Sequence, residues 1–131
     1  MKPSKPQPPR PTQAELEILR VLWQRGPSSV REAQQTLAET REMGYTTVLK
    51  LLQIMAAKGL VFRDEQARIH VYRAALPQEQ TQRQLVRDLL ERAFDGSASQ
   101  LILQALATRR ATPKEMREIR RMLDQAEGMK P

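Results

Sequence analysis

The sequence has 131 residues, which suits one domain or one small domain with an appended segment. Hydrophobic residues make up 40% of it and aromatic residues only 4%, so the core has to be aliphatic. There is no cysteine, which excludes disulfides, thiolate metal sites and cysteine nucleophiles. No apolar run approaches the ~18 residues of a membrane span and no secretory signal is present, so we expect a cytoplasmic protein without membrane insertion.

The formal net charge of +7 is unevenly placed along the chain. Residues 1–11 carry three basic residues and no acid, and residues 40–76 carry six basic and three acidic residues. A local basic excess suits a polyanionic partner, although net charge alone is also explained by solubility. Residues 1–11 also contain five prolines, so we expect them to form a disordered, basic tail.

Two helices are predicted to follow the tail. Thr12 and Glu15 form a capping box, which marks a helix start, and Gly26-Pro27 ends that helix. Its apolar stripe has helical spacing and consists of Leu16, Ile18, Leu19, Leu22 and Trp23. Either Ser28 or Ser29 caps the second helix. The inward positions of this second helix are Val30, Ala33 and Leu37.

A third helix is predicted from Tyr45 to Lys58, with Gly59 as its stop. Its core positions are Val48, Leu51, Leu52 and Met55. A strip without any acid lies on the other side and comprises Thr46, Lys50, Gln53 and Ala57, with Thr47 flanking it. Such a strip can present hydroxyls, an ammonium and an amide to base edges in a major groove. The alternative is that any amphipathic helix has a polar strip.

Two runs rich in strand-forming residues, Leu60–Arg63 and Arg68–Arg73, predict a β-hairpin with residues 64–67 at its tip. The tip lacks the Asn-Gly or Asp-Gly that favours a tight turn. Three helices followed by a two-stranded ribbon predict a winged helix-turn-helix domain over residues 12–76. Its third helix is then the recognition helix, and the ribbon is the wing.

Candidate contacts outside the third helix are arginines. Arg63, Arg68 and Arg73 lie on or beside the ribbon and suit a phosphate or a minor groove. Arg31 at the start of the second helix suits a phosphate. Each is also explained as an exposed surface charge. His70 is the single histidine and lacks clustered carboxylates, and the chain has no glycine-rich phosphate loop. We therefore expect no enzyme, no metal site and no cofactor.

Residues 77–128 predict three further helices, separated at Asp95-Gly96 and at Thr112-Pro113. The middle helix is apolar nearly all round and requires burial, yet three helices in about fifty residues form a poor independent core. We therefore expect a helical dimerisation domain. Its expected contacts are Leu85, Leu89, Phe94, Leu101, Ile102, Leu106, Ile119 and Leu123. The expected fold class is mainly α with a small β-hairpin: a winged helix-turn-helix domain plus a three-helix C-terminal dimerisation arm.

Six segments of residues 12–127 together form a recognisable pattern. They are Glu15–Trp23, Val30–Glu32, Tyr45–Leu52, Met55–Leu60, His70–Tyr72 and Phe94–Ser97. Their order and spacing resemble the penicillinase-repressor (BlaI/MecI/CopY) family of winged-helix transcriptional regulators. The wing differs from the family pattern in one place, since Ala67 stands where the family commonly has glycine before Arg68.

The resemblance implies a homodimeric transcriptional repressor that binds a palindromic operator, with Thr46, Thr47, Lys50 and Gln53 at the recognition positions. In well-known members a membrane-bound sensor metalloprotease triggers cleavage in the C-terminal arm. The corresponding segment here is near Leu103–Ala105 and has no clear cleavage signature. The copper-responsive branch uses cysteines, so a copper sensor of that kind is excluded. The alternative function is a winged-helix protein-interaction module without sequence-specific DNA binding.

Overall fold

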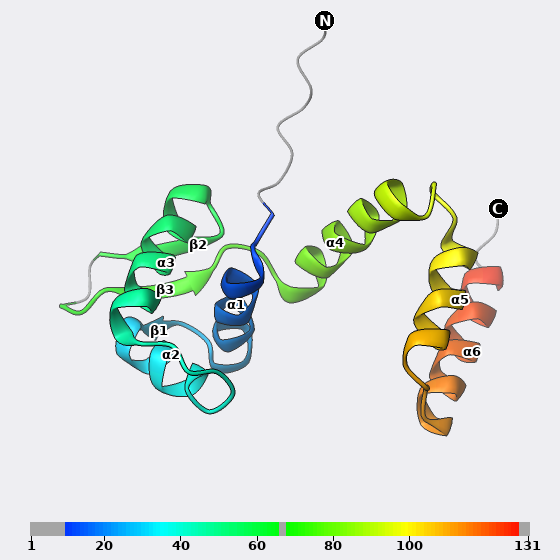
Figure 1. Ribbon diagram of the computed structural model, residues 1–131, viewed down its shortest axis with the longest axis horizontal. Helices are drawn as coiled ribbons and strands as arrows, with labels where there is room; N and C mark the ends of the chain where they lie inside the picture. Colours follow the sequence, from blue (N-terminus) through cyan, green and yellow to red (C-terminus); the bar gives the residue numbers. More distant parts are fainter. Residues whose placement is uncertain (1–9, 66–67, 129–131) are drawn as a thin grey trace, which may run out of the picture. The chain divides into compact units, whose positions relative to one another are not determined.

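The computed structural model describes residues 10–65 and 68–128. The chain divides into two compact units, which meet between Val86 and Arg87 within the sequence (Figure 1). Most of the predicted tail, residues 1–9, lies outside the described residues, as do residues 66–67 of the predicted hairpin tip.

Helix α1, Gln13–Arg25, begins at the predicted capping box. The Thr12 hydroxyl accepts from the Glu15 backbone N–H at 3.2 Å, and the Glu15 carboxylate accepts from the Thr12 N–H at 2.8 Å. Two of the free amides at the helix start are thereby satisfied. The helix ends at Gly26, whose φ of 93° is a conformation that favours glycine.

Helix α2, Val30–Leu37, is capped by Ser29, so the second of the two candidate serines is the cap. Its hydroxyl accepts from the Glu32 N–H at 3.1 Å, and Glu32 accepts in return from the Ser29 N–H at 3.0 Å. Ser28 is instead buried and starts a short strand β1, Ser28–Ser29, which the sequence pattern did not predict. Serine has little strand propensity, so this strand depends on pairing with its neighbour.

Helix α3, Tyr45–Lys58, has the predicted bounds. Gly59 follows it with φ 83°, the left-handed conformation expected of a glycine stop. At the other end Gly44 occupies the N-cap without a side-chain hydrogen bond. The start of α3 therefore lacks the capping box that α1 and α2 both have.

The sheet has three antiparallel strands in the order β1-β3-β2, one more strand than the predicted hairpin. Strand β2 is Val61–Asp64 and β3 is Val71–Ala74. The second strand is shorter than the predicted Arg68–Arg73, because the β2–β3 ladder ends at the pair Asp64 and Val71. Residues 68–70, which precede β3, lie outside the printed ladder, and Ile69 is 68% exposed.

The two faces of the sheet differ in what they cover. Arg63 pairs with Tyr72 and Phe62 with Arg73, and side chains alternate between faces along a strand. Tyr72 is 1% exposed and belongs to the core, so its face is the inner one. Phe62 and Arg73 therefore lie on the outer face.

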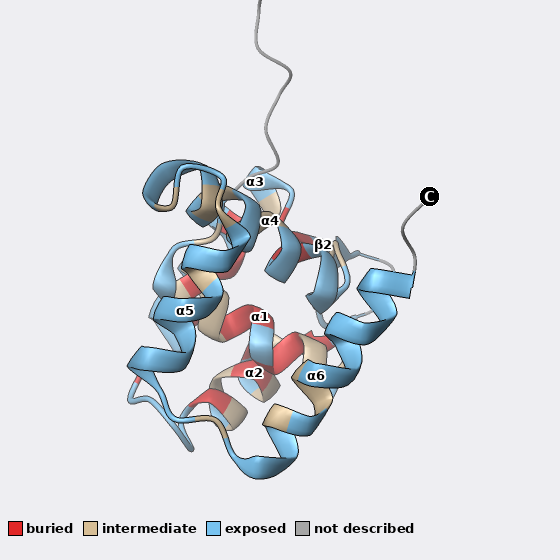
Figure 2. Cartoon of the chain, turned by 90° about the vertical axis from the view of Figure 1, so that its right-hand side faces the viewer, coloured by how far each residue is buried: buried red, intermediate tan, exposed pale blue. Residues whose placement is uncertain are grey.

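The core of the winged unit is aliphatic, as the composition predicted, with Tyr72 as its one aromatic member among the described residues. It combines buried side chains of α1, α2 and α3 with those beside and within the sheet (Figure 2). The apolar residues predicted to face inward on α2 are all buried, as are Val48, Leu52 and Met55 of α3. Trp23 lies at the edge of the core, where its indole N–H donates to the Leu76 carbonyl at 3.0 Å.

Three helices complete the chain: α4, Gln78–Ala93; α5, Ala98–Thr108; and α6, Pro113–Gly128. Their predicted boundaries are confirmed. Asp95 and Gly96 both have positive φ before α5, and Thr112 exchanges hydrogen bonds of 3.1 Å with Glu115 at the start of α6. The expected burial of α5 is not met within one chain, because α5 and α6 have no buried residue (Figure 2).

Candidate nucleic-acid interface

The outward side of α3 carries the residues that the sequence placed there. Thr46, Thr47, Lys50 and Gln53 are all exposed, whereas Val48, Leu52 and Met55 have no accessible surface. The helical period of 3.6 residues produces this separation, because positions three and four apart share a face. The strip is continuous over the length of the helix.

The charge of this side of α3 is positive. The helix contains two lysines and no acidic residue. The Lys50 ammonium makes no ion pair within the described part of the chain, so its charge and hydrogen-bond donors remain available to a partner. An exposed, unpaired cation on an acid-free helix is attracted to a phosphate backbone or a guanine edge.

Lys58, at the end of the same helix, has a structural partner instead. Its ammonium donates to both oxygens of Glu15 at 2.9 and 3.0 Å, joining the end of α3 to the start of α1. Burial by itself raises the pKa of the Glu15 carboxyl. The hydrogen bonds from the Thr12 backbone N–H and from the Lys58 ammonium, together with the charge of Lys58, outweigh that effect, so the pKa is lowered overall. The carboxylate thus stays ionised in a nearly enclosed position.

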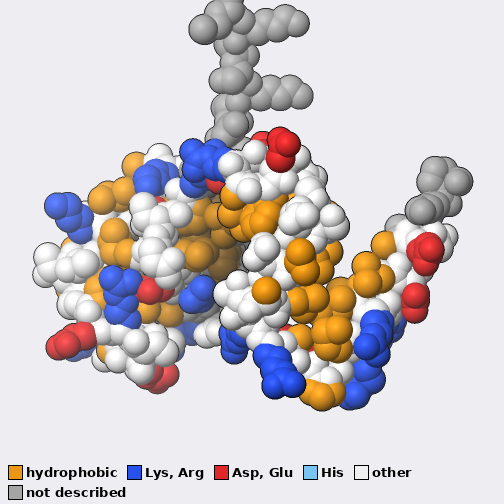
Figure 3. Space-filling model, turned by 45° about the vertical axis from the view of Figure 1, so that its right-hand side comes forward, with side chains coloured by type: hydrophobic (Ala, Val, Ile, Leu, Met, Phe, Trp, Pro, Cys, Tyr) orange, Lys and Arg blue, Asp and Glu red, His pale blue; other side chains and the backbone are white. Residues whose placement is uncertain are grey.

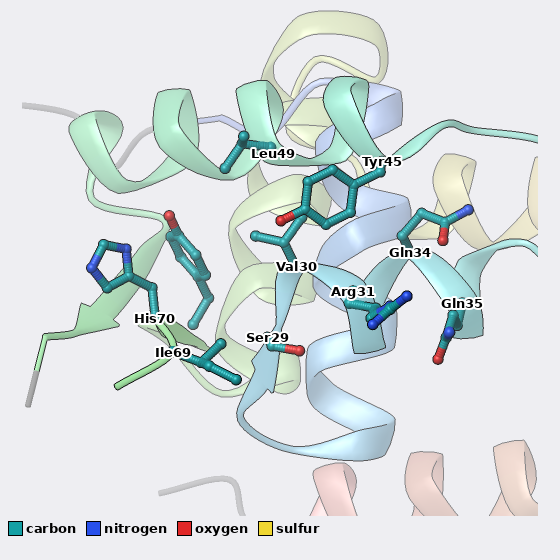
Figure 4. A pocket seen from close by; sticks show the side chains of 10 residues that line it. Ser29, Val30, Arg31, Gln34, Gln35, Tyr45, Leu49, Ile69 and His70 are labelled. Carbon is teal, nitrogen blue, oxygen red and sulfur yellow. The ribbon is translucent and has the colours of Figure 1, made fainter. Parts of the chain in front are cut away.

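Beside the strip, α2, α3 and the root of the wing enclose an open hollow of about 770 Å³ (Figure 4). Val30, Leu49 and Tyr72 supply apolar surface to it. Arg31, Gln34, Gln35, Tyr45, Ile69 and His70 also line it, together with Ser29. None of the lining residues is acidic. The hollow therefore presents apolar surface together with hydrogen-bond donors, which suits a sugar-phosphate segment.

Arg31 lies on α2, is exposed and lines this hollow. The acid next to it in sequence, Glu32, is engaged elsewhere, since it caps α2 and pairs with Arg25 at 2.5 Å. Arg31 itself makes no ion pair with any residue the structure describes. Its place beside α3 is consistent with the predicted phosphate contact.

The arginines of the wing are not equivalent. Arg63 forms an ion pair with Glu65, and hydrogen bonds to Glu65 and to the Tyr72 hydroxyl raise its pKa. Arg68 is exposed and follows the undescribed residues 66–67. Arg73 lies over the Phe62 ring, 4.8 Å from its centroid, on the outer face of the sheet. Arg63 and Arg73 therefore have different partners in the structure, the carboxylate of Glu65 and the ring of Phe62.

Two exposed apolar residues of α3 were absent from the predicted contacts. Tyr45 is 51% exposed and Ile54 is 39% exposed. The sequence carried a signal for Ile54, which lies four residues after Lys50 and seven after Thr47, on the same side of the helix. Sequence reasoning missed it because an isoleucine in an amphipathic helix is ordinarily assigned to the core and the outward side was expected to be polar.

The residues predicted for dimerisation lie on the three C-terminal helices. Leu85, Phe94, Leu101 and Ile119 are half-buried, and Leu89, Ile102, Leu106 and Leu123 are exposed. Among the described residues there is no cluster of side chains that could hold a metal ion. No helix within residues 10–65 and 68–128 is long and apolar enough to cross a lipid bilayer.

Three helices, a small antiparallel sheet and an exposed basic third helix define a winged-helix protein of the kind found in transcriptional regulators. The sequence matches the family described as penicillinase repressor over residues 11–125, and the chain belongs to this family.

Individual relatives agree with that assignment. The chain is 32% identical over 90 residues to the transcriptional regulator BlaI of Mycobacterium tuberculosis, a match covering 68% of this chain and 65% of that protein. It thus spans slightly less than two thirds of that relative's length. It is 21% identical over 122 residues to the penicillinase repressor of Bacillus licheniformis, covering 93% of this chain and 95% of that one. These names are those of regulators of transcription, not of enzymes.

A solved structure is also similar, that of the monomeric form of Bacillus licheniformis BlaI in complex with the blaP half-operator. The similarity has a TM-score of 0.49 at 23% identity and covers 56% of this chain and 89% of the other.

Proposed function

We propose that this protein is a homodimeric transcriptional repressor that binds a palindromic operator through α3 and the wing. Residues 12–76 form its DNA-binding domain and residues 77–128 its dimerisation domain. The observation that carries the proposal is the exposed, acid-free side of α3 in a member of the penicillinase-repressor family. A helix with hydroxyl, amide and ammonium groups on one side suits a major groove.

The residues of the strip have different roles in this proposal. Lys50 reaches a guanine edge or a phosphate, and Gln53 offers its amide to an adenine. Thr46 and Thr47 lie in the first turn of α3, where small hydroxyls allow the backbone to approach the DNA. These four side chains are already exposed, so their contact with DNA requires no rearrangement of the core.

Phosphate contacts flank the strip. Arg31 contacts the phosphate backbone of one DNA strand from the hollow beside α3. His70 lines the same hollow. Arg68 contacts the backbone or minor groove from the wing, and Arg63 joins it once its ion pair with Glu65 opens. Contacts of this type set the position of the protein on the duplex and depend strongly on salt.

The dimer is supported by the surface that α5 and α6 leave uncovered. Hydrophobic side chains gather over these helices (Figure 3), and Leu103 and Leu123 are 57% and 55% exposed. A helix such as α5, which contains no charged residue, is stable in water only when another surface covers it. A second copy presenting the same faces provides that cover and gives the molecule two recognition helices.

Release from DNA is proposed to follow regulated proteolysis or another signal. The segment near Leu103–Ala105 lies in α5, so a protease can cut it only after this part of the helix unwinds. A membrane sensor protease is the partner in the proteolytic version. Incubation of the full chain with such a protease, followed by mass spectrometry, tests that version directly, since an uncut chain would contradict it.

The DNA-binding test begins with selection of duplexes from a random pool by the full chain. We expect Lys50→Ala and Thr47→Ala each to lower affinity for the selected duplex by roughly 1–3 kcal/mol per lost base contact. Lys114→Ala is the matched control, because Lys114 is an exposed lysine on α6 outside the proposed interface. Unchanged binding of both α3 variants in a gel shift would contradict the assignment of α3.

Salt dependence separates this function from the alternative of a protein-interaction module. Affinity for the selected duplex should fall steeply between ~50 and ~200 mM salt, because phosphate contacts release counterions. Failure to bind any duplex at low salt would favour the protein-interaction module.

A further inference from the structure

Ile54 is the one large aliphatic side chain of α3 that is exposed. Val48, Leu52 and Met55 are buried, and Leu49 and Leu51 are partly buried against the same core. Ile54 belongs to neither group and is 39% exposed. Part of its apolar surface is therefore accessible on the outward side of α3, where a partner can contact it.

The surroundings of Ile54 indicate which partner that is. Residues three and four positions away on a helix are its surface neighbours, and here these include Lys50, Ala57 and Lys58. Lys58 is paired with Glu15, so the available charge beside Ile54 is that of Lys50. An apolar group next to this cation, on a helix without an acid, is unsuited to a basic or purely apolar protein surface. It is suited to a polyanion that offers an apolar group between its charges.

The major groove of DNA offers one such group. Among the four bases only thymine carries a methyl group at the groove edge, and apolar side chains contact it directly. Four residues of helix rise by about 6 Å, which corresponds to about two base steps of 3.4 Å. A thymine contacted by Ile54 should therefore lie within about two base pairs of the base or phosphate that Lys50 contacts.

We propose that Ile54 is a specificity-determining residue that reads the 5-methyl group of a thymine in each operator half-site. The inference rests on the proposed function, since it assumes that α3 enters the major groove. It adds a sequence preference that the polar residues of the strip do not explain.

The test removes each partner of the contact in turn: the 5-methyl group of the thymine, and the side chain of Ile54. Each thymine of a duplex selected by the full-length protein is replaced singly by deoxyuridine, which lacks only the 5-methyl group. At one thymine of the half-site we expect binding of the unaltered protein to weaken about three- to fivefold, the effect of one buried methyl-sized group. Ile54→Ala should bind the thymine and deoxyuridine duplexes equally, and Ile54→Val should show an intermediate preference.

The matched control is Phe62→Ala. Phe62 is also an exposed apolar residue of the winged unit, but it lies on the outer face of the sheet beside Arg73. Phe62→Ala should keep the full preference for thymine. Circular dichroism and thermal unfolding of each variant confirm that it is folded.

Three results would overturn the inference, and they differ from failure of the proposed function. Deoxyuridine could leave binding unchanged at every position, the preference could persist in Ile54→Ala, or Phe62→Ala could abolish it. In each case sequence-specific binding would stand while the role of Ile54 would fall. Recovery of no preferred sequence from the random pool would instead overturn the proposed function and this inference with it.

Discussion

At the scale of single residues, the two lysines of α3 differ in their partners. Lys58 is held by Glu15, a carboxylate that is 1% exposed, whereas Lys50 has no ion pair among the described residues. The difference follows from position, because Lys58 ends the helix beside α1 and Lys50 lies on its outward side. Lys58 therefore contributes to the packing of α3 on α1, and Lys50 remains available for the proposed recognition of DNA.

Glu15→Gln is expected to lower the free energy of unfolding by about 1–3 kcal/mol, because a charged hydrogen-bond acceptor of Lys58 and Thr12 is lost. The folded pKa of Glu15 lies below its ordinary value of 4.5. Its stabilising effect is therefore complete above that value and is lost as the pH falls through the folded pKa. Urea unfolding at pH 7 and at about pH 3 measures both effects.

In Glu15→Gln this loss of stability in acid should be smaller than in the unaltered protein. Glu17→Gln is the matched control, since Glu17 forms an exposed pair with Arg41 and exposed pairs contribute little. An equal effect of the two substitutions at pH 7 would show that burial of the Glu15 pair is unimportant.

Glu65→Gln is expected to strengthen DNA binding. The ion pair with Glu65 occupies Arg63, and removing the acid frees this guanidinium and removes repulsion of phosphate. The dependence of log affinity on log salt should steepen by about one phosphate contact. Titrations with the selected duplex at several salt concentrations measure this. Glu79→Gln, at an exposed acid of α4, should have no such effect, and weaker binding of Glu65→Gln would refute the proposed role of Arg63.

At the scale of elements, the two ends of α3 should respond in opposite ways to substitution of glycine. Gly59→Ala should destabilise the protein by about 1–2 kcal/mol, because φ there is 83° and a side chain resists that conformation. Gly44→Ser should stabilise it by roughly 0.5–1 kcal/mol, because φ is −76° and a hydroxyl there can cap a helix start that has no side-chain cap.

Thermal unfolding of both glycine variants gives the two signs in one experiment. A Cβ at either glycine would meet no heavy atom within 4 Å apart from those of its chain neighbours, so crowding does not affect the comparison. A stabilising Gly59→Ala would contradict the backbone conformation at the end of α3.

At the scale of the whole molecule, the unburied faces of α5 and α6 predict self-association. Ile102→Glu together with Leu123→Glu should convert the proposed dimer into a monomer, because carboxylates would have to be buried in the interface. Sedimentation equilibrium at micromolar concentration measures the change. The variant should also lose the advantage of a two-fold duplex over a single half-site.

Arg109→Gln is a suitable control for that variant, since Arg109 is exposed at the end of α5 and is outside the predicted contacts. A monomeric unaltered protein at the same concentration would refute dimerisation while leaving half-site binding open to measurement.

The features that could be predicted from the sequence are those whose interacting groups lie close together along the chain. The starts of α1, α2 and α6 were predictable because each capping box spans only four residues. The end of α3 at Gly59 was predictable for the same local reason. The outward strip of α3 followed from helical spacing alone.

The sequence by itself thus determined the helices, the class of fold and the family to which the chain belongs. The tertiary structure decided the third strand at Ser28–Ser29, since that strand exists only through pairing with β3. It also decided which charges remain available, because Glu15 and Lys58 are 43 positions apart and meet only after folding. The exposure of Ile54, on which its proposed role depends, was decided in the same way, because it depends on which side of α3 the core covers.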